Sequence, residues 1–251
     1  MNRKQALSMY LIGTFGQVLG VSLLVWFLRA EGVKVDFTSP IGIIAVVLGG
    51  LSSAFWGGLV SISYRQSTFQ QVLKDFFQVK DSLANYFLVL IFLVLDFFPS
   101  ILGGKIITQS LVLPVVLFFK ALLFGGVEEI GWRYFFQPTL QEKRSYISAT
   151  LITFLAWSIW HLFYFYIDGS LAVIQLLPFL VGLLINCFIL SALYHKTQNL
   201  WICVMTHACI NSLSQILVNE DVWLSIVSKF LILSLAIMIA KKNHINVKEE
   251  K

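Results

Sequence analysis

The chain has 251 residues, of which 58% are hydrophobic and only 12% are charged, and its mean hydropathy is +0.82. No soluble domain of this length covers so much apolar surface, so the composition excludes that class and predicts an integral membrane protein. The net charge of +5 comes from short loops between apolar runs, which argues against a nucleic-acid partner and predicts contact with membrane lipid headgroups.

Apolar runs long enough to form membrane helices recur along the whole chain. A spanning helix needs roughly 20 mostly apolar residues. We expect eight spans, at about 6–28, 41–64, 86–104, 107–137, 147–167, 171–194, 199–217 and 222–240. No linker or internal repeat interrupts them. The sequence therefore predicts an all-α, polytopic transmembrane helical bundle, a single integral membrane domain over residues 1–251 with a motif-bearing core at about 107–217.

Residues 65–84 follow a different pattern from the spans. Phe69, Leu73, Phe76 and Phe77 recur there at helical spacing among charged side chains. This arrangement is typical of an amphipathic helix that lies along the membrane interface.

The lysines and arginines outside the predicted spans indicate an orientation. With the N-terminus inside, twelve of them fall in cytoplasmic segments and three in outside loops. The cytoplasmic set is Arg3, Lys4, Arg65, Lys74, Lys80, Lys143, Arg144, Lys196, Lys241, Lys242, Lys248 and Lys251. The outside set is Arg29, Lys34 and Lys105. This positive-inside bias predicts a multi-pass protein of the cell membrane with both termini in the cytoplasm.

Charged side chains inside the predicted spans are candidates for function, because each costs about 2.5–3.5 kcal/mol to insert. The strongest cluster is the segment EEIGWR at 128–133. Glu129 and Arg133 are four residues apart, so they share a helical face and are expected to pair as structural support. Glu128 is rotated by about 100° from Glu129, which leaves it for general-base chemistry. The alternative is that both glutamates share Arg133.

Two further pairs lie one helical turn apart in later spans. Trp157 and His161 fall in the run 147–167, where the histidine is either a packing residue or part of a site. His207 and Asn211 fall in the run 199–217. Both of these side chains can donate hydrogen bonds to an oxyanion, and both can equally well form interhelical hydrogen bonds.

Together these residues suit the addition of water to an amide. Glu128 is expected to deprotonate the water, His161 to help to position it, and His207 and Asn211 to stabilise the tetrahedral anion. We expect no cofactor, since Asn211 suits an oxyanion better than a metal. The alternative is a zinc centre held by Glu128, His161 and His207, although the HExxH pattern of many zinc proteases is missing.

The three motifs resemble those of the CAAX prenyl endopeptidase, bacteriocin-processing and abortive-infection family of intramembrane proteases (CPBP, Abi), which carry EExxxR, then FxxxH, then HxxxN or HxxxD. The matching residues are Glu128, Glu129 and Arg133 for the first motif, His161 for the second, and His207 and Asn211 for the third. Trp157 stands where the family usually has phenylalanine. By this resemblance, the difference changes an aromatic ring that packs in the protein or faces the substrate, and it does not change the proposed chemistry.

The resemblance implies hydrolysis of a peptide bond near the cytoplasmic membrane face, an activity long called metalloprotease in family names. It implies a peptide or membrane-protein substrate, with CAAX-like processing, bacteriocin maturation and self-immunity as the candidate roles. Two rivals remain from other classes. One is a non-catalytic immunity or scaffold protein with the same fold. The other is a transporter with Asp96, Lys120, Glu128 and Arg133 along an ion path, although the chain lacks the matched repeats of many transporters.

Overall fold

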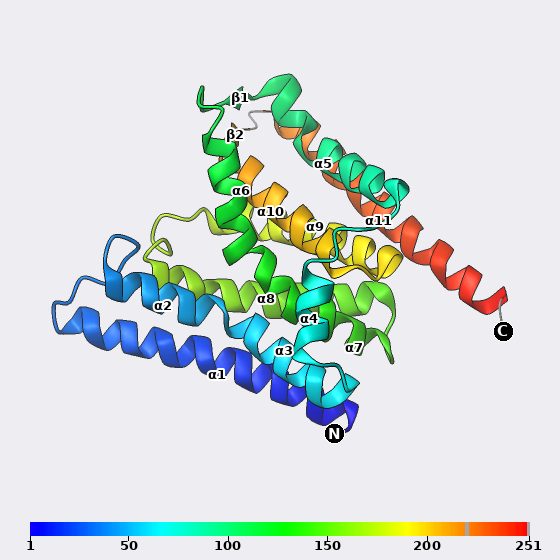
Figure 1. The fold of residues 1–251 in the computed structure, drawn as a ribbon. Coiled ribbons are helices and arrows are strands. Elements are labelled where there is room, and N and C mark those ends of the chain that lie inside the picture. The colour runs from blue at the N-terminus through cyan, green and yellow to red at the C-terminus, as the bar shows by residue number, and fades with distance from the viewer. Residues whose placement is uncertain (219–220, 250–251) are drawn as a thin grey trace. The chain divides into compact units, whose positions relative to one another are not determined.

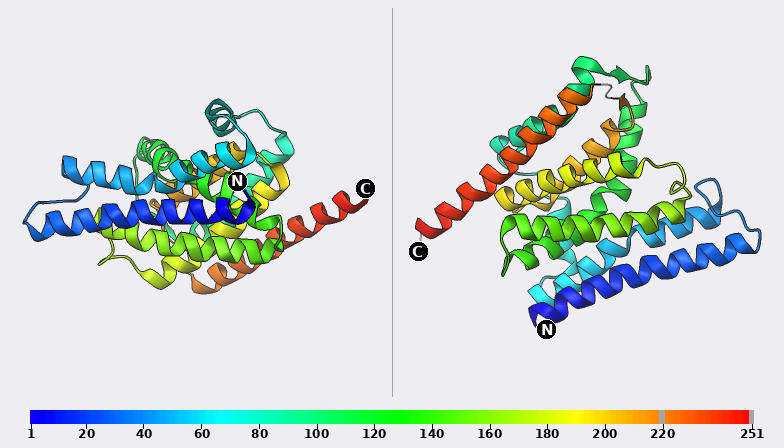
Figure 2. Two further views of the ribbon diagram at one scale, coloured as in Figure 1. Left: turned by 90° about the horizontal axis from the view of Figure 1, so that it is seen from below. Right: turned by 180° about the vertical axis from the view of Figure 1, so that it is seen from behind.

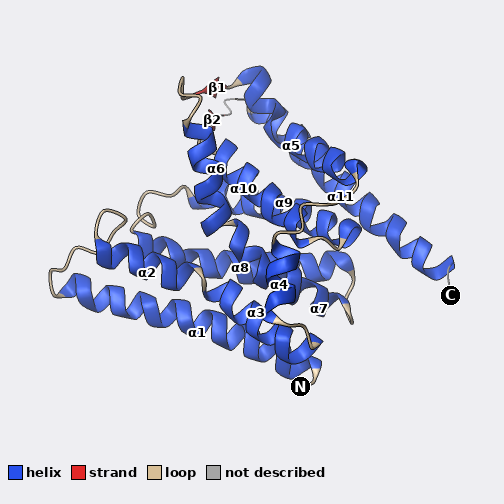
Figure 3. Ribbon diagram, viewed as in Figure 1, coloured by secondary structure: helices blue, strands red, loops and turns tan. Residues whose placement is uncertain are grey.

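The structure is a computed structural model that describes residues 1–218 and 221–249. Figure 3 shows helix almost throughout, which confirms the all-α fold class. The chain divides into two compact units, each assembled from two separated stretches. The first comprises Met1–Val72 and Glu128–Leu183, and the second Leu73–Val127 and Leu184–Lys251. Three elements cross the unit boundaries: α4 (Phe69–Phe76), the short helix η1 (Gly126–Glu128) and α9 (Leu176–Thr197).

The first unit is built around a set of long helices that lie alongside one another (Figures 1 and 2). Its elements are α1 (Arg3–Ala30), α2 (Pro40–Gly50), α3 (Ser52–Arg65), the π-helix η2 (Ile130–Phe136), α7 (Gln137–Gln141) and α8 (Tyr146–Asp168). α1 packs on α2, α3 and α8, and α3 packs on η2. Side-chain caps fix where the long helices begin, because Asn2, Ser39 and Ser145 accept hydrogen bonds from first-turn backbone N–H groups.

Small residues allow α3 and η2 to approach closely. A Cβ atom built on Gly57 would lie 2.4 Å from Gly131 Cα, and one built on Gly131 would lie 2.1 Å from Ser53 Oγ. Without a large hydrophobic drive between helices in lipid, such small-residue contacts are a main source of packing energy. The close approach places α3 directly against the segment that carries the two glutamates.

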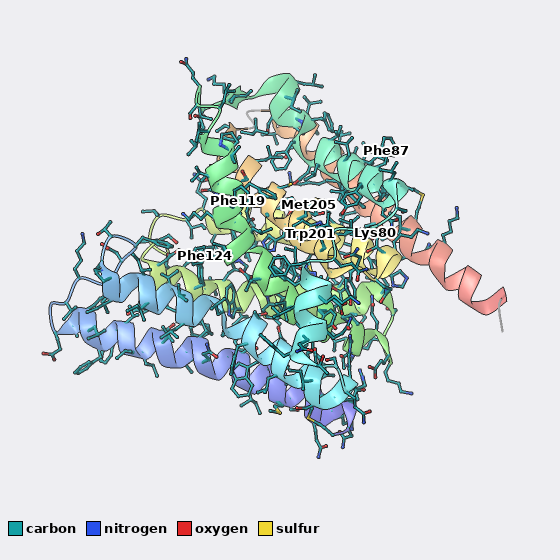
Figure 4. The ribbon with its side chains drawn as sticks, viewed as in Figure 1. Lys80, Phe87, Phe119, Phe124, Trp201 and Met205 are labelled. Atoms are coloured by element: carbon teal, nitrogen blue, oxygen red, sulfur yellow. The ribbon has the colours of Figure 1, made fainter. Side chains whose placement is uncertain are left out.

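The second unit comprises α5 (Leu83–Gly103), β1 (Lys105–Ile106), α6 (Leu113–Phe124), α10 (Leu200–Leu213), β2 (Leu217–Val218) and α11 (Val222–Glu249). α5 packs on α11, and α6 and α5 pack on α10. The strands pair antiparallel, with Lys105 opposite Val218. Figure 4 shows Phe119 and Phe124 on α6 and Trp201 and Met205 on α10, so large apolar side chains line both helices of this pair.

Six helices among the described residues are long and apolar enough to cross a membrane. They are Arg3–Ala30, Pro40–Arg65, Leu83–Gly103, Tyr146–Asp168, Leu176–Thr197 and Val222–Lys242. Two of the eight expected spans do not appear as one long helix. The run 199–217 contains a helix of only 14 residues, shorter than the hydrocarbon core. The run 107–137 is broken, because α6 ends at Phe124 before Gly125 and Gly126, and η1 and η2 follow.

The amphipathic helix expected near 65–84 is present as α4, which covers a shorter stretch. Phe69, Leu73 and Phe77 form an exposed apolar stripe at a spacing of four residues, whereas Phe76 is buried and does not belong to it. Its position along the membrane interface stays a prediction. Of the basic residues used for the orientation, Lys251 and the side chain of Lys248 lie outside the described part of the chain.

Candidate active site

The EEIGWR segment separates its two glutamates as its spacing predicts. Arg133 Nε lies 3.5 Å from Glu129 Oε2, and both side chains are fully buried. The predicted i,i+4 ion pair is therefore confirmed, even though this stretch is π-helical in part. An ion pair removed from water in this way holds its two residues in one geometry, because breaking it would leave an unpaired buried charge.

Glu128 makes a different contact. Its Oε2 atom accepts a hydrogen bond of 2.8 Å from Trp157 Nε1, and the side chain is only 5% exposed. Its backbone carbonyl accepts a hydrogen bond from Ser53 Oγ at 3.3 Å, and that hydroxyl also bonds the Tyr10 hydroxyl at 3.0 Å. The carboxylate and the backbone of Glu128 are thus each oriented by a neighbouring helix, from α8 on one side and α3 on the other.

Trp157 contacts Glu128, Arg133 and His161. Besides donating to Glu128, its ring lies under the Arg133 guanidinium, whose Cζ is 4.6 Å from the ring centroid, a cation–π arrangement. The His161 ring lies 5.3 Å away on the same helix. The sequence predicted packing or substrate contact for Trp157 and missed its hydrogen bond. The signal was present, because a buried indole N–H normally finds an acceptor.

His161 is held in a defined state. Its Nδ1 lies 2.8 Å from the Trp157 carbonyl oxygen, which can only accept, so Nδ1 carries a proton, and in the neutral form of the ring the lone pair is on Nε2. Four aromatic rings surround it at centroid distances of 5.0–5.5 Å. They belong to Trp157, Trp160, Phe165 and Phe179. A histidine fixed in this tautomer can accept a hydrogen bond from water through Nε2.

In the second unit, α10 carries the other predicted pair. Asn199 caps this helix by accepting a hydrogen bond from the Trp201 backbone N–H, which sets where the helix begins. His207 is 3% exposed and Asn211 is half-buried. Their spacing of four residues places both on one face of α10.

The side chains of His207 and Asn211 both lie close to the backbone at Gly125, in the same unit. A Cβ atom built there would lie 2.6 Å from Asn211 Nδ2 and 3.1 Å from His207 Nε2. Any larger residue at this position would displace one or both nitrogens. The glycine therefore allows two potential hydrogen-bond donors to point to the same place, as two donors to a single oxyanion must.

The zinc alternative needs three protein ligands at one place. In the part of the chain that the structure describes, no group of three or more His, Cys, Asp or Glu side chains is arranged to hold a metal ion. Of the three predicted ligands, Glu128 and His161 belong to the first unit and His207 to the second. The zinc alternative thus stays a prediction.

Comparison with known proteins identifies the motif-bearing part of the chain. Residues 109–213 match the family model described as type II CAAX prenyl endopeptidase Rce1-like. The matched segment contains every residue of the three motifs, from Glu128 to Asn211. No curated protein matches the chain. Residues 109–213 are therefore similar to the Rce1-like family of type II CAAX prenyl endopeptidases, and the apolar helices of the chain are those of a membrane protein.

Proposed function

We propose that the protein is an intramembrane endopeptidase that hydrolyses a peptide bond near the cytoplasmic membrane face, with Glu128 as its general base. The observation that carries this proposal is the state of the Glu128 carboxylate. It is buried, and the Trp157 indole orients it, while the adjacent Glu129 forms the ion pair with Arg133. A carboxylate held in this way in apolar surroundings suits proton abstraction from water.

In the proposed reaction, Glu128 takes a proton from water while the water oxygen adds to the carbonyl carbon of the scissile bond. His161, as the neutral ring, positions this water by accepting its second hydrogen bond through Nε2, while Nδ1 donates to the Trp157 carbonyl. His207 and Asn211 donate hydrogen bonds to the oxyanion of the tetrahedral intermediate. The C–N bond then breaks, the proton on Glu128 passes to the leaving amine, and the carboxylate is restored.

The proposed substrates are peptides or membrane proteins presented at the cytoplasmic membrane face, in CAAX-like processing or in bacteriocin maturation and self-immunity. The test is the cleavage of a fluorogenic CAAX-type peptide, farnesylated or unprenylated, by the full chain in proteoliposomes. Glu128→Gln should lower kcat/KM by about 10²–10⁴-fold, the usual contribution of a general base. His207→Ala and Asn211→Ala should each lower it by about 10²–10³-fold, as for the loss of an oxyanion donor.

Glu129→Gln is the matched control, because it makes the same isosteric change at the adjacent residue. It should lower the thermal midpoint, since Arg133 loses its buried partner, whereas Glu128→Gln should leave the midpoint near that of the wild type. If the Glu128→Gln variant cleaved the peptide with the kcat/KM of the wild type, the proposal would be refuted. A wild-type chain that binds a partner protein but cleaves none of the peptides would favour the non-catalytic immunity or scaffold role.

The same assay distinguishes the metal-free reaction from the zinc alternative. We propose that cleavage continues in EDTA or 1,10-phenanthroline. If a chelator abolished cleavage and added Zn²⁺ restored it, the general-base reaction would have to be replaced by one at a zinc centre held by Glu128, His161 and His207.

A further inference from the structure

The first unit contains an open cavity of about 490 Å³ that none of the proposed catalytic residues lines. Its walls are four basic side chains and two leucines: Arg3, Lys4, Leu7, Leu140, Lys143 and Arg144. The basic residues come from the start of α1 and from the turn between α7 and α8. A volume of this size accommodates a small ligand or a lipid headgroup.

The chain holds the start of α1 in place by specific contacts. Asn2 and Gln5 form a reciprocal capping box, with both hydrogen bonds at 3.0 Å. Arg3 Nε then donates to the Thr139 carbonyl oxygen at 2.9 Å, across 136 residues of sequence. Arg3 Nη2 donates to the Leu140 carbonyl oxygen at 3.4 Å. These bonds join the start of α1 to α7 at one end of the unit (Figure 1).

The charge in this cavity is not balanced by the protein. Glu142 lies 3.8 Å from Arg3 and also accepts a hydrogen bond from the Tyr64 hydroxyl, so one acid partly offsets one base. The side chains of Lys4, Lys143 and Arg144 are exposed, and within the described residues they make neither a hydrogen bond nor an ion pair.

The basic residues also adjoin two helix N-termini. Arg3 and Lys4 occupy the first turn of α1, and Lys143 and Arg144 precede Ser145, the cap of α8. Neither first turn contains an acid. A cation at the positive end of a helix dipole is unfavourable, whereas an anion there is stabilised. Helix stability therefore does not account for these four residues, and an anionic ligand would.

The positive-inside preference explains why basic residues occur in cytoplasmic loops. It does not require basic side chains from different loops to line one cavity. Lys74 and Lys80 satisfy it without lining this cavity. We propose that the cavity binds the phosphate of an anionic phospholipid. Lys4, Lys143 and Arg144 contact the phosphate oxygens, with the arginine able to engage two at once, and Leu7 and Leu140 contact the glycerol and upper acyl chain. Basic pockets at the cytoplasmic side of membrane helices suit such headgroups.

This inference does not rest on the proposed protease activity, so its test uses lipid binding as the readout. The full chain, purified in a neutral detergent, is titrated with phosphatidylglycerol, with phosphatidylcholine of the same acyl chains, and with inorganic phosphate. Native mass spectrometry and the thermal midpoint report binding. We expect phosphatidylglycerol to bind at least tenfold more tightly than phosphatidylcholine, and millimolar phosphate to compete only weakly.

The variant Lys4→Gln/Lys143→Gln/Arg144→Gln should lose this preference. Each cation near a headgroup contributes about fivefold in affinity, so the affinity of the triple variant for phosphatidylglycerol should fall roughly a hundredfold. The matched control Lys74→Gln/Lys80→Gln/Lys241→Gln removes the same charge at exposed positions elsewhere and should keep the preference. The single variants Lys4→Gln and Lys143→Gln, each expected to lose about fivefold, serve if the triple variant is unstable.

Three results would overturn the proposal. An equal loss in the control variant would show that bulk charge alone attracts the lipid. Equal binding of the two lipids by the wild type would show that there is no anion site. Tight binding of inorganic phosphate that displaces the lipid completely would assign the cavity to a soluble anion.

Discussion

At the scale of single residues, Trp157 contacts three of the groups on which the proposed reaction depends: Glu128, Arg133 and His161. Trp157→Phe keeps an aromatic ring but removes the N–H group. A hydrogen bond to a charged group is worth roughly 1.5–3 kcal/mol. If that energy orients the Glu128 carboxylate for proton abstraction, kcat should fall by about tenfold to a hundredfold with little change in KM. Steady-state peptide cleavage in proteoliposomes measures both constants.

Trp160 provides the control for this prediction. It is fully buried on the same helix, and its Nε1 donates to Ser52 Oγ at 2.8 Å. Trp160→Phe removes an equivalent hydrogen bond away from Glu128, so it should lower the thermal midpoint and leave kcat unchanged. If both variants lost kcat equally, Trp157 would be a packing residue rather than a positioning residue.

The Glu129–Arg133 ion pair was predicted from the sequence and the Glu128–Trp157 hydrogen bond was not, and the difference has a physical reason. The Glu129–Arg133 pair was predicted because four-residue spacing on one helix is a local property. The bond between Glu128 and Trp157 joins two distant segments, and hydropathy and spacing carry no information about it. The sequence did indicate that each residue needed a partner. The predicted ion pair of Glu129 with Arg133 assigned no partner to Glu128, and a buried tryptophan N–H needs an acceptor.

At the scale of helices and strands, the long spans were predicted because hydropathy over about 20 residues decides them. The break after Phe124 was not, since the run 107–137 is apolar enough to be taken for one helix. There the backbone depends on Gly125 and Gly126, and on Gly57 from another helix, which contacts Gly131 in the π-helical stretch. The two-residue strands β1 and β2 carry no periodicity that a sequence could show.

The packing of α5 on α11 offers a prediction at this scale. Asp96 on α5 interacts electrostatically with Lys229 on α11, and Lys229 Nζ also donates to Ser225 Oγ. Lys229→Met leaves an uncompensated carboxylate within an apolar helix pair. It should destabilise the protein by roughly 2.5–3.5 kcal/mol, the cost of a lone charge at membrane depth. Asp96→Asn should do the same for the lysine. Thermal unfolding in detergent measures the effect.

The double variant Asp96→Asn/Lys229→Met tests whether the two charges act together. It removes both charges, so it should recover more than half of the stability lost in either single variant. Additive losses would contradict a coupled pair and would indicate that each residue interacts with other groups.

At the scale of the whole molecule, each unit separates the predicted inside and outside residues by itself. In the first unit, Arg3 and Arg65 both bond α7 or the residues just before it, at the carbonyls of Thr139 and Tyr134. In contrast, Arg29 donates to the Ile167 carbonyl at the far end of α8. The predicted cytoplasmic residues thus gather at one end and a predicted outside residue lies at the other.

The second unit shows the same separation. Its predicted cytoplasmic residues Lys196 and Lys242 line one cavity together with Asn85, near the start of α5. Lys105, which is predicted to lie outside, pairs with Val218 beyond the end of the same helix. Within each unit, the positions of the basic residues thus agree with the predicted orientation.

Both termini are therefore predicted to be cytoplasmic, and cysteine labelling in intact cells tests this orientation. The natural cysteines are first removed by Cys187→Ala, Cys203→Ala and Cys209→Ala. Glu31→Cys, in the exposed turn after α1, should then react with a membrane-impermeant maleimide, because that turn is predicted to face outwards. Lys80→Cys, exposed before α5, should react only after the membrane is opened. The reverse pattern would invert the protein and move the proposed lipid cavity to the outer face. Labelling of both positions from outside would mean that an even number of segments crosses between them, in conflict with the single candidate span found there, Pro40–Arg65.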